Sequence, residues 1–303
     1  MVAGGSQTSE MSEIRGLDVD KAVKGFALVS YVFKNDCQVN SMSGDSIRWY
    51  KETAADLEPS SPQQVANISR LSTLPTLEVS WTRTTSYPRK YATEGFISME
   101  DIKSADIDVI ARTLLRLTRA ITKQVDTRIY DVVTEGMSTT TTVAGLAAAT
   151  INTVTASGAW NTTTSANPIK DIMEAKRKIW TYNYNPEGAS LWMSPTAHEY
   201  LLTWLINTKG SSVPNFASAK VETGVVMNFL GLNVKVSNNV TGTSGSAVVV
   251  IPKQACTWKT YQDTTSAVIE SKGLGSTIRV WEIGEPILHD PRAVCIINGV
   301  ETA

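Results

Sequence analysis

The sequence predicts an α+β protein, in which helices and strands alternate without regular strand–helix–strand units. Residues 99–135 carry apolar side chains at helical spacing, and short runs of alternating or β-branched apolar residues predict strands on both sides of them. The composition agrees with an ordered chain. Of 303 residues, 42% are apolar, and 28 Lys and Arg stand against 29 Asp and Glu, which excludes a disordered protein.

Charge and cysteine content exclude several classes of function. A formal net charge of −1 gives no electrostatic basis for tight binding to nucleic acid. Cys37, Cys256 and Cys295 are too few and too widely spaced for a disulfide framework or a CxxC metal site. The chain has no apolar run of about 18 residues and no signal-peptide pattern at its start. We therefore expect no membrane segment, no metal and no cofactor.

Motifs of enzymes are missing from the sequence. It contains no GxGxxG, GxxxxGK[ST], HExxH or GxSxG pattern and no EF-hand loop. His198, in a predicted helix, and His289, at a predicted turn, are the two imidazoles, and a hydrolase that pairs one with a serine stays open as an alternative. Asp106 and Asp108 would not share a helix face, so they do not predict a metal site. We expect a protein that is not an enzyme.

Residues 1–43 are expected to form an N-terminal arm and lead-in. The first 25 residues begin with small and polar side chains that cannot form a core element, so an arm would become ordered only against a partner. The apolar run 27–33 fits either a short buried helix or a strand.

Residues 44–97 predict a long β-hairpin, an extended loop. Its arms are 45–51 and 77–85, where apolar and polar residues alternate, and the segment between them is rich in Ser and Pro. An isolated two-stranded ribbon is marginally stable in water, so we expect it to pack on another subunit, although folding back on its own domain is an open alternative. The predicted inter-subunit contact residues are Trp49, Tyr50, Trp81, Tyr87, Arg89, Lys90 and Tyr91.

The strongest predicted helix covers residues 99–135. Ser98 and Asp101 form the pattern of a capping box, and apolar residues follow at spacings of three and four up to Val132. About 32 residues would make a rod of roughly 48 Å, too long for a compact domain of half this chain. Its basic face is either solvated or contacts an acidic neighbour or nucleic acid, and it consists of Arg112, Arg116, Arg119 and Lys123.

The rest of the chain predicts a mixed region of strands and two short helices. The Thr-rich, uncharged segment 138–167 predicts an ordered insertion of strands. Asn167 before a proline predicts the start of one helix and Ser194 before a proline the start of another. The first helix is expected to have its apolar register at Ile169, Ile172, Met173, Lys176 and Ile179. Strands are predicted at 189–194, 229–237, 247–252, 278–283 and 293–297.

This order of elements resembles the major capsid protein of tailed double-stranded DNA bacteriophages, over nearly the whole chain. Residues 168–179 and 191–201 are similar to the helix–strand–helix that opens the axial domain of that family. The segment 229–240 resembles its leucine–glycine–x–x–valine turn and strand. Residues 290–299 resemble its closing proline–x–alanine–valine strand.

The resemblance implies a Hong Kong 97-like fold with an extended loop at 44–97 and a spine helix at 99–135. It also implies a peripheral domain of 98–167 and 252–303 and an axial domain of 168–251. The implied function is structural: copies self-assemble into the hexamers and pentamers of an icosahedral head, which encloses double-stranded DNA without sequence-specific binding. The implied location is the virion, after assembly in the host cytoplasm.

The same resemblance implies further partners, namely a portal, a decoration or cement protein in some members, and a scaffold. The long helical scaffolding segment of many members is not found here, so we expect a separate scaffolding protein or a segment already removed. Some members crosslink a loop lysine to a neighbour; Lys51 and Lys90 do not align with that lysine, and no crosslink is predicted. The alternative is an encapsulin shell of the same fold. A tail or decoration protein would leave the helix at 99–135 unexplained.

Overall fold

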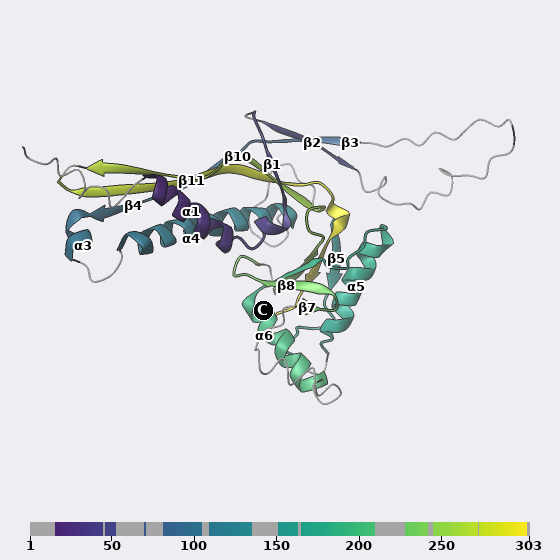
Figure 1. The fold of residues 1–303 in the computed structure, drawn as a ribbon. Helices are drawn as coiled ribbons and strands as arrows, with labels where there is room; N and C mark the ends of the chain where they lie inside the picture. Colours follow the sequence, from purple (N-terminus) through teal and green to yellow (C-terminus); the bar gives the residue numbers. More distant parts are fainter. Residues whose placement is uncertain are drawn as a thin grey trace, which may run out of the picture.

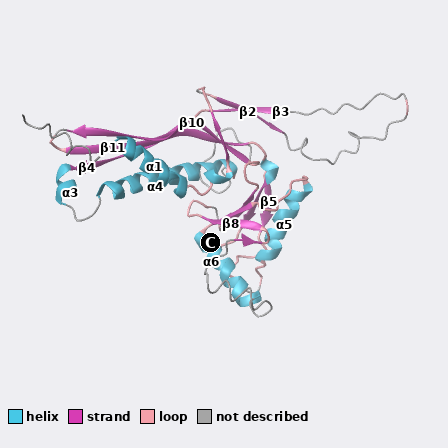
Figure 2. Ribbon diagram, viewed as in Figure 1, coloured by secondary structure: helices cyan, strands magenta, loops and turns pink. Residues whose placement is uncertain are grey.

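The protein is described by a computed structural model, which covers residues 16–44, 46–52, 70, 81–104, 109–134, 151–162, 165–209, 228–241, 245–271 and 273–301. Its helices and strands form four layers: a long sheet, a pair of helices, a second sheet and two further helices (Figures 1 and 2). The first two layers lie side by side along the long direction of the molecule, and the other two extend away from one end of them (Figure 1).

The long sheet has four strands in the order β1-β10-β11-β4. Its strands are β1 (Gln38–Ser41), β4 (Arg89–Ser98), β10 (Cys256–Ser271) and β11 (Gly275–Leu288). β1 runs parallel to β10, and the other neighbours are antiparallel. Gly275 begins β11 with φ +150°, and a side chain there would overlap the carbonyl oxygen of Ile97 on β4. The close approach of these two strands therefore requires a glycine.

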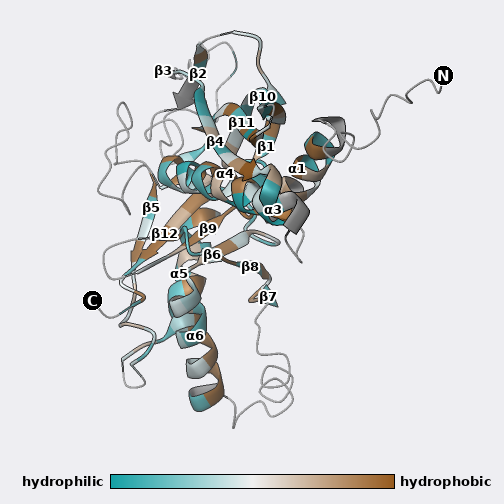
Figure 3. Cartoon of the chain, turned by 90° about the vertical axis from the view of Figure 1, so that its left-hand side faces the viewer, coloured by the Kyte–Doolittle hydropathy of each residue, from teal (hydrophilic) through white to brown (hydrophobic). Residues whose placement is uncertain are grey.

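Two helices, α1 (Gly16–Ser30) and α4 (Val109–Val133), cover one face of this sheet, as Figure 3 shows. Val19, Val23 and Ala27 lie four residues apart on α1 and are buried against α4 and β10. The prediction of an arm over the first 25 residues therefore differs from the structure from residue 16 onward. The reason is that this apolar stripe, interrupted by charged residues, is enough to anchor a helix.

The Ser98 half of the predicted capping box is confirmed: the backbone N–H of Asp101 donates to Ser98 Oγ at 3.0 Å. Of the helix predicted over 99–135, the structure describes α3 (Met99–Ser104) and α4. Residues 105–108, with the two aspartates of the DxD pattern, lie outside the described residues.

The second sheet has six strands in the order β5-β12-β9-β6-β8-β7. Its strands are β5 (Asn152–Thr155), β6 (Ser190–Met193), β7 (Asn228–Phe229), β8 (Leu232–Val236), β9 (Ser246–Val250) and β12 (Val294–Asn298). A turn with positive φ at Leu230 and Gly231 joins β7 to β8. The strands predicted for this half of the chain are confirmed within a few residues. Of the predicted insertion 138–167, residues 138–150, which precede β5, lie outside the described residues.

The central strands β12, β9 and β6 of this second sheet are buried on both faces and separate two hydrophobic cores. On β9, Val248 and Val250 point into the core that also contains α1, α4 and the long sheet, whereas Ala247 and Val249 point into the other core. The strand β12 alternates in the same way. Burial on both faces explains why these strands are continuous apolar runs without polar alternation.

The last layer consists of α5 (Pro168–Thr181) and α6 (Pro195–Trp204), which pack on the outer face of the second sheet. Both predicted N-caps are confirmed: Asn167 Oδ1 accepts from the N–H of Lys170 at 3.2 Å, and Ser194 Oγ accepts from the N–H of Ala197 at 2.9 Å. The predicted register of α5 is wrong at Met173, which is 41% exposed, because α5 turns its buried face away from that position.

The extended ribbon is present at its base. β2 (Ile47–Glu52) and β3 (Trp81–Ser86) pair antiparallel, and among the described residues they join neither of the larger sheets (Figure 1). The predicted arm thus extends to Ser86, and its tip lies outside the described residues except for Arg70. Residues 89–97, predicted as part of the loop, lie in β4 (Arg89–Ser98) of the long sheet.

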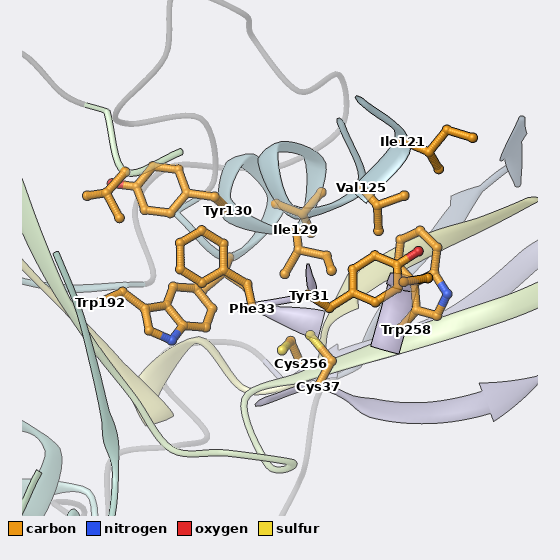
Figure 4. Packing of buried hydrophobic residues seen from close by; sticks show 14 of the residues in the cluster. Tyr31, Phe33, Cys37, Ile121, Val125, Ile129, Tyr130, Trp192, Cys256 and Trp258 are labelled. Carbon is orange, nitrogen blue, oxygen red and sulfur yellow. The ribbon is translucent and has the colours of Figure 1, made fainter. Parts of the chain in front are cut away.

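The domain boundaries expected above stay a prediction. The strands of the two larger sheets are not grouped as those boundaries would group them. β5 and β12 come from the segments expected in the peripheral domain, but they pair in the six-stranded sheet beside β9. The segment between α1 and β1 packs on the second sheet within the first core: the ring of Phe33 stacks on Trp192 of β6 at 4.3 Å between centroids (Figure 4).

Candidate assembly surfaces

The base of the ribbon is anchored by a buried carboxylate, Glu285 of β11. It accepts a hydrogen bond from Arg128 Nε of α4 at 3.1 Å and from Ser86 Oγ at the end of β3 at 3.5 Å, and Arg89 lies 3.7 Å away. Burial raises the pKa of Glu285, and the Arg128 guanidinium opposes that shift. Glu285 therefore connects Ser86, the last residue of β3, to the long sheet and to α4.

The predicted inter-subunit residues on this ribbon fall into separate groups. Trp49 and Tyr50 lie on β2 and Trp81 on β3, and their side chains are outside the described part of the structure. Tyr87 follows β3 and is 68% exposed, so it is available to a neighbour.

The other three predicted residues lie on β4, in the long sheet. Arg89 is exposed, and Lys90 Nζ lies 5.7 Å from the centre of the Trp281 ring. Tyr91 packs towards the core of its own chain, with its ring 6.4 Å from that of Trp258, and burial raises the pKa of its hydroxyl. The structure brings Arg89, Lys90 and Tyr91 together on one strand and separates them from the ribbon.

The basic face predicted on the long helix lies on α4. Arg112, Arg116, Arg119 and Lys123 are all exposed and recur at spacings of four, three and four residues, which places them along one stripe. Near its C-terminal end the stripe borders a surface hollow of about 370 Å³ that Asn238 and Asn239 also line. The arrangement can contact a run of phosphates or an acidic protein surface.

A carboxylate lies at the inner side of that hollow. Asp126 of α4 accepts backbone hydrogen bonds from Val32 at 2.8 Å, Lys34 at 3.2 Å and Phe33 at 3.3 Å. Burial raises the pKa of Asp126 to about 6, and these three N–H groups oppose the shift. Asp126 therefore fixes the segment between α1 and β1 onto α4 rather than offering a free ligand.

One surface was not predicted as a site. Met173 and Trp180 of α5 are 41% and 44% exposed, and with Lys170, Glu174 and Arg177 they line a hollow of about 460 Å³. The sequence signal for it was present, because positions 170, 173, 177 and 180 form one stripe at helical spacing. It was missed because Met173 was assigned to the buried face.

The two histidines of the hydrolase alternative lie on different elements, His198 on α6 and His289 after β11. Burial lowers the pKa of both. Within the described ranges, no three or more His, Cys, Asp or Glu side chains are grouped so that they could bind a metal ion. None of the helices described is both long and apolar enough to cross a membrane.

Comparison with known proteins decides the family. The profile of a phage capsid protein family matches residues 83–297, which is more than half of the chain. The chain belongs to this phage capsid protein family. No curated protein is recognisably similar to the sequence.

Solved capsid structures share the fold of this capsid protein. The capsid of cyanophage P-SCSP1u superposes with a TM-score of 0.61 at 16% identity, over 88% of this chain and 87% of that one. Mycobacterium phage Che8 gives 0.59 at 15% identity over 86% of both chains. A virus-like particle from Pyrococcus furiosus gives 0.60 at 12% identity, over 93% of this chain and 98% of that one.

Family and fold together confirm the resemblance stated from the sequence. The chain is a structural protein of a tailed-phage capsid shell and has the Hong Kong 97-like fold, with mixed helices and sheets. The likeness to the Pyrococcus particle does not favour the encapsulin alternative, because the profile that matches is that of a phage family.

Proposed function

We propose that this capsid protein is the major shell subunit of an icosahedral head and that it assembles as hexamers and pentamers around double-stranded DNA. The family match over residues 83–297 carries the proposal. The ribbon β2–β3 supports it, because a two-stranded sheet that projects from both cores gains stability by lying on a neighbouring copy. In this role the chain itself is not a catalyst.

The packaged DNA would meet the exposed basic stripe of α4. Four cations on one face suit phosphate contacts, and a net charge of −1 for the whole chain suits binding that is weak and independent of sequence. We further propose a separate scaffolding protein, a portal and a decoration or cement protein as partners, with assembly in the host cytoplasm and the finished chain in the virion. No crosslink through Lys51 or Lys90 is proposed.

The test is the assembly state of the purified chain, measured by native mass spectrometry and negative-stain microscopy. We expect pentamers, hexamers or closed particles. The measurement is made on the chain alone and on the chain co-expressed with its scaffolding protein. A chain that stays a monomer at high concentration under both conditions would contradict the proposal.

A matched variant shows whether the ribbon contributes to assembly. Residues 53–80 are replaced by a two-residue Asn-Gly turn, which keeps β2 and β3 paired. We expect the variant to fold, with the circular dichroism spectrum of the parent, but to form shells at least tenfold less often at equal concentration, because an extended loop shortened by residues 53–80 covers less of the neighbouring copy. Unchanged assembly would contradict the role given to the ribbon.

A further inference from the structure

The fold brings two of the three cysteines to one place. Cys37 follows the short 3-10 helix Lys34–Asp36 and has extended backbone angles, φ −79° and ψ 149°, directly before β1. Cys256 is the first residue of β10. Since β1 and β10 run parallel with Gln38 opposite Thr257, the residues that precede these two, Cys37 and Cys256, are the next pair in the same register.

The two thiols lie in one environment. Residues opposite each other on paired strands point to the same face of a sheet, and both thiols are buried in the core that also contains α1 and α4. Figure 4 shows their sulfur atoms next to each other. Burial and a hydrogen bond with the Cys256 thiol raise the pKa of Cys37. The pair is therefore protonated, shielded and in direct contact.

The spacing of the pair fits a disulfide bond. Neighbouring strands lie about 4.8 Å apart, and a disulfide joins residues whose Cα atoms are about 4.4–6.8 Å apart. The third cysteine does not compete for this bond, because Cys295 lies on β12 and points into the other core. Cys37 also lines a surface hollow of about 680 Å³, through which a small reagent can approach the pair from solvent.

We propose that Cys37 and Cys256 are a redox site and form an intrachain disulfide with a low-molecular-weight disulfide, such as oxidised glutathione, as the oxidant. The Cys37 thiol loses its proton to water, and its sulfur attacks one sulfur of the oxidant and releases one thiol. Cys256 then loses its proton and displaces the second thiol. The chain gives up two hydrogen atoms and gains one S–S bond, while the oxidant is reduced to two thiols.

The bond fastens the segment between α1 and β1 to the long sheet. That segment also contacts the second sheet, because Asp36, the neighbour of Cys37, accepts from Ser190 and Trp192 of β6. The cytosol keeps such a pair as thiols, whereas a particle outside the cell meets an oxidising medium. The inference goes beyond the proposed function. Only its timing, thiols during assembly and a disulfide in released particles, rests on that proposal.

Oxidation of the purified full chain tests the pair from two starting points. The native chain, and the chain refolded from urea, are held in mildly alkaline buffer with oxidised glutathione until their composition no longer changes. Remaining thiols are then alkylated in urea, and intact mass and peptide maps are measured without reductant. We expect a chain that has lost two hydrogens, with Cys37 joined to Cys256 and with Cys295 alkylated. The reaction of the native chain should be slower, because burial disfavours the thiolate.

A chain that keeps its cysteines unpaired from both starting points, or that joins one of the pair to Cys295, would overturn the proposal. A bond that forms only in the refolded chain would contradict its formation in released particles. These measurements do not depend on capsomers or shells. Failure of the chain to assemble would therefore overturn the proposed function and leave this inference standing.

Matched variants separate the pair from the third cysteine. Cys295→Ala should form the same bond as the parent, and Cys256→Ala should not lose two hydrogens. The oxidised parent should unfold at a urea concentration about 1 M higher than the reduced parent, because a bond between segments far apart in sequence restricts the unfolded chain. Cys256→Ala should show no such rise. An oxidised parent that unfolds at the same or a lower concentration would contradict the fastening of β1 to β10.

Discussion

At the scale of single residues, buried carboxylates determine how separate segments meet. Asp126 accepts three backbone N–H groups from the turn that follows α1, and thus satisfies donors at the start of the short 3-10 helix Lys34–Asp36. Its pKa is nevertheless raised to about 6, because burial disfavours the charged carboxylate more than these bonds favour it.

This shift predicts a pH dependence of stability. Since the folded-state pKa of about 6 lies above the ordinary value of 3.8, Asp126 binds protons more tightly in the folded chain. Its contribution is fully present below pH 3.8 and is lost as the pH rises through 6. Urea unfolding should therefore show that the free-energy advantage of the parent over Asp126→Asn decreases between about pH 4 and pH 7. An advantage that is constant or grows with pH would contradict this assignment.

The sequence predicts the helix N-caps, because each cap depends only on residues within one helical turn. The caps at Ser98, Asn167 and Ser194 were predicted correctly, because each follows from a short pattern next to a proline or an acidic residue. Met173 was placed on the wrong face of α5, and Tyr91, expected along the ribbon, lies on β4 of the long sheet. Whether an aromatic or a methionine points inwards depends on elements far away in the sequence, here β10 for Tyr91 and the second sheet for Met173.

At the scale of elements, the strand β10 shows the limit of pattern analysis. The segment 256–271 was not predicted as a strand, although it is the longest in the structure. Its pairing with β11 shifts register between Thr260 and Gln262 and again between Gln262 and Thr265. Each shift breaks the alternation of inward and outward residues, so the period of two that identifies a strand is lost.

The beginning of β11 gives a prediction at this scale. Gly275→Ala should destabilise the chain by about 3 kcal/mol, because the added Cβ overlaps the backbone of β4 and the residue has φ +150°. Gly273→Ala is the matched control in the same turn, where φ is +80° but the space is open, and about 1 kcal/mol is expected. Chemical denaturation of the two variants measures the difference, and equal losses would show that the contact with Ile97 is unimportant.

At the scale of the whole molecule, another carboxylate connects the segment between α1 and β1 to the second sheet. Asp36 accepts from Ser190 Oγ at 3.0 Å and Trp192 Nε1 at 2.7 Å on β6, and from Lys235 Nζ of β8 at 2.8 Å. The class of fold and most elements of the second sheet followed from the sequence. This connection did not, because its partners are separated by more than 150 residues and no local pattern relates them.

Removing that carboxylate tests the connection. Asp36→Ala should lower the free energy of unfolding by about 3 kcal/mol, since a partly exposed lysine, a buried indole N–H and a buried hydroxyl lose their acceptor. The control is Asp20→Ala, which removes the acceptor of the Ser266 N–H within the first core alone and should cost about 1 kcal/mol. Tryptophan fluorescence during urea unfolding reports both, and a smaller loss for Asp36→Ala than for Asp20→Ala would contradict the prediction.

The strands β9 and β12 send alternate side chains into both cores, so one sheet belongs to each half of the subunit at once. A flexible linker between the halves would let them tilt independently when a force acts on the capsid shell. Because the second sheet is part of both cores, a force applied to either half is transmitted directly to the other, and the subunit responds as one rigid body.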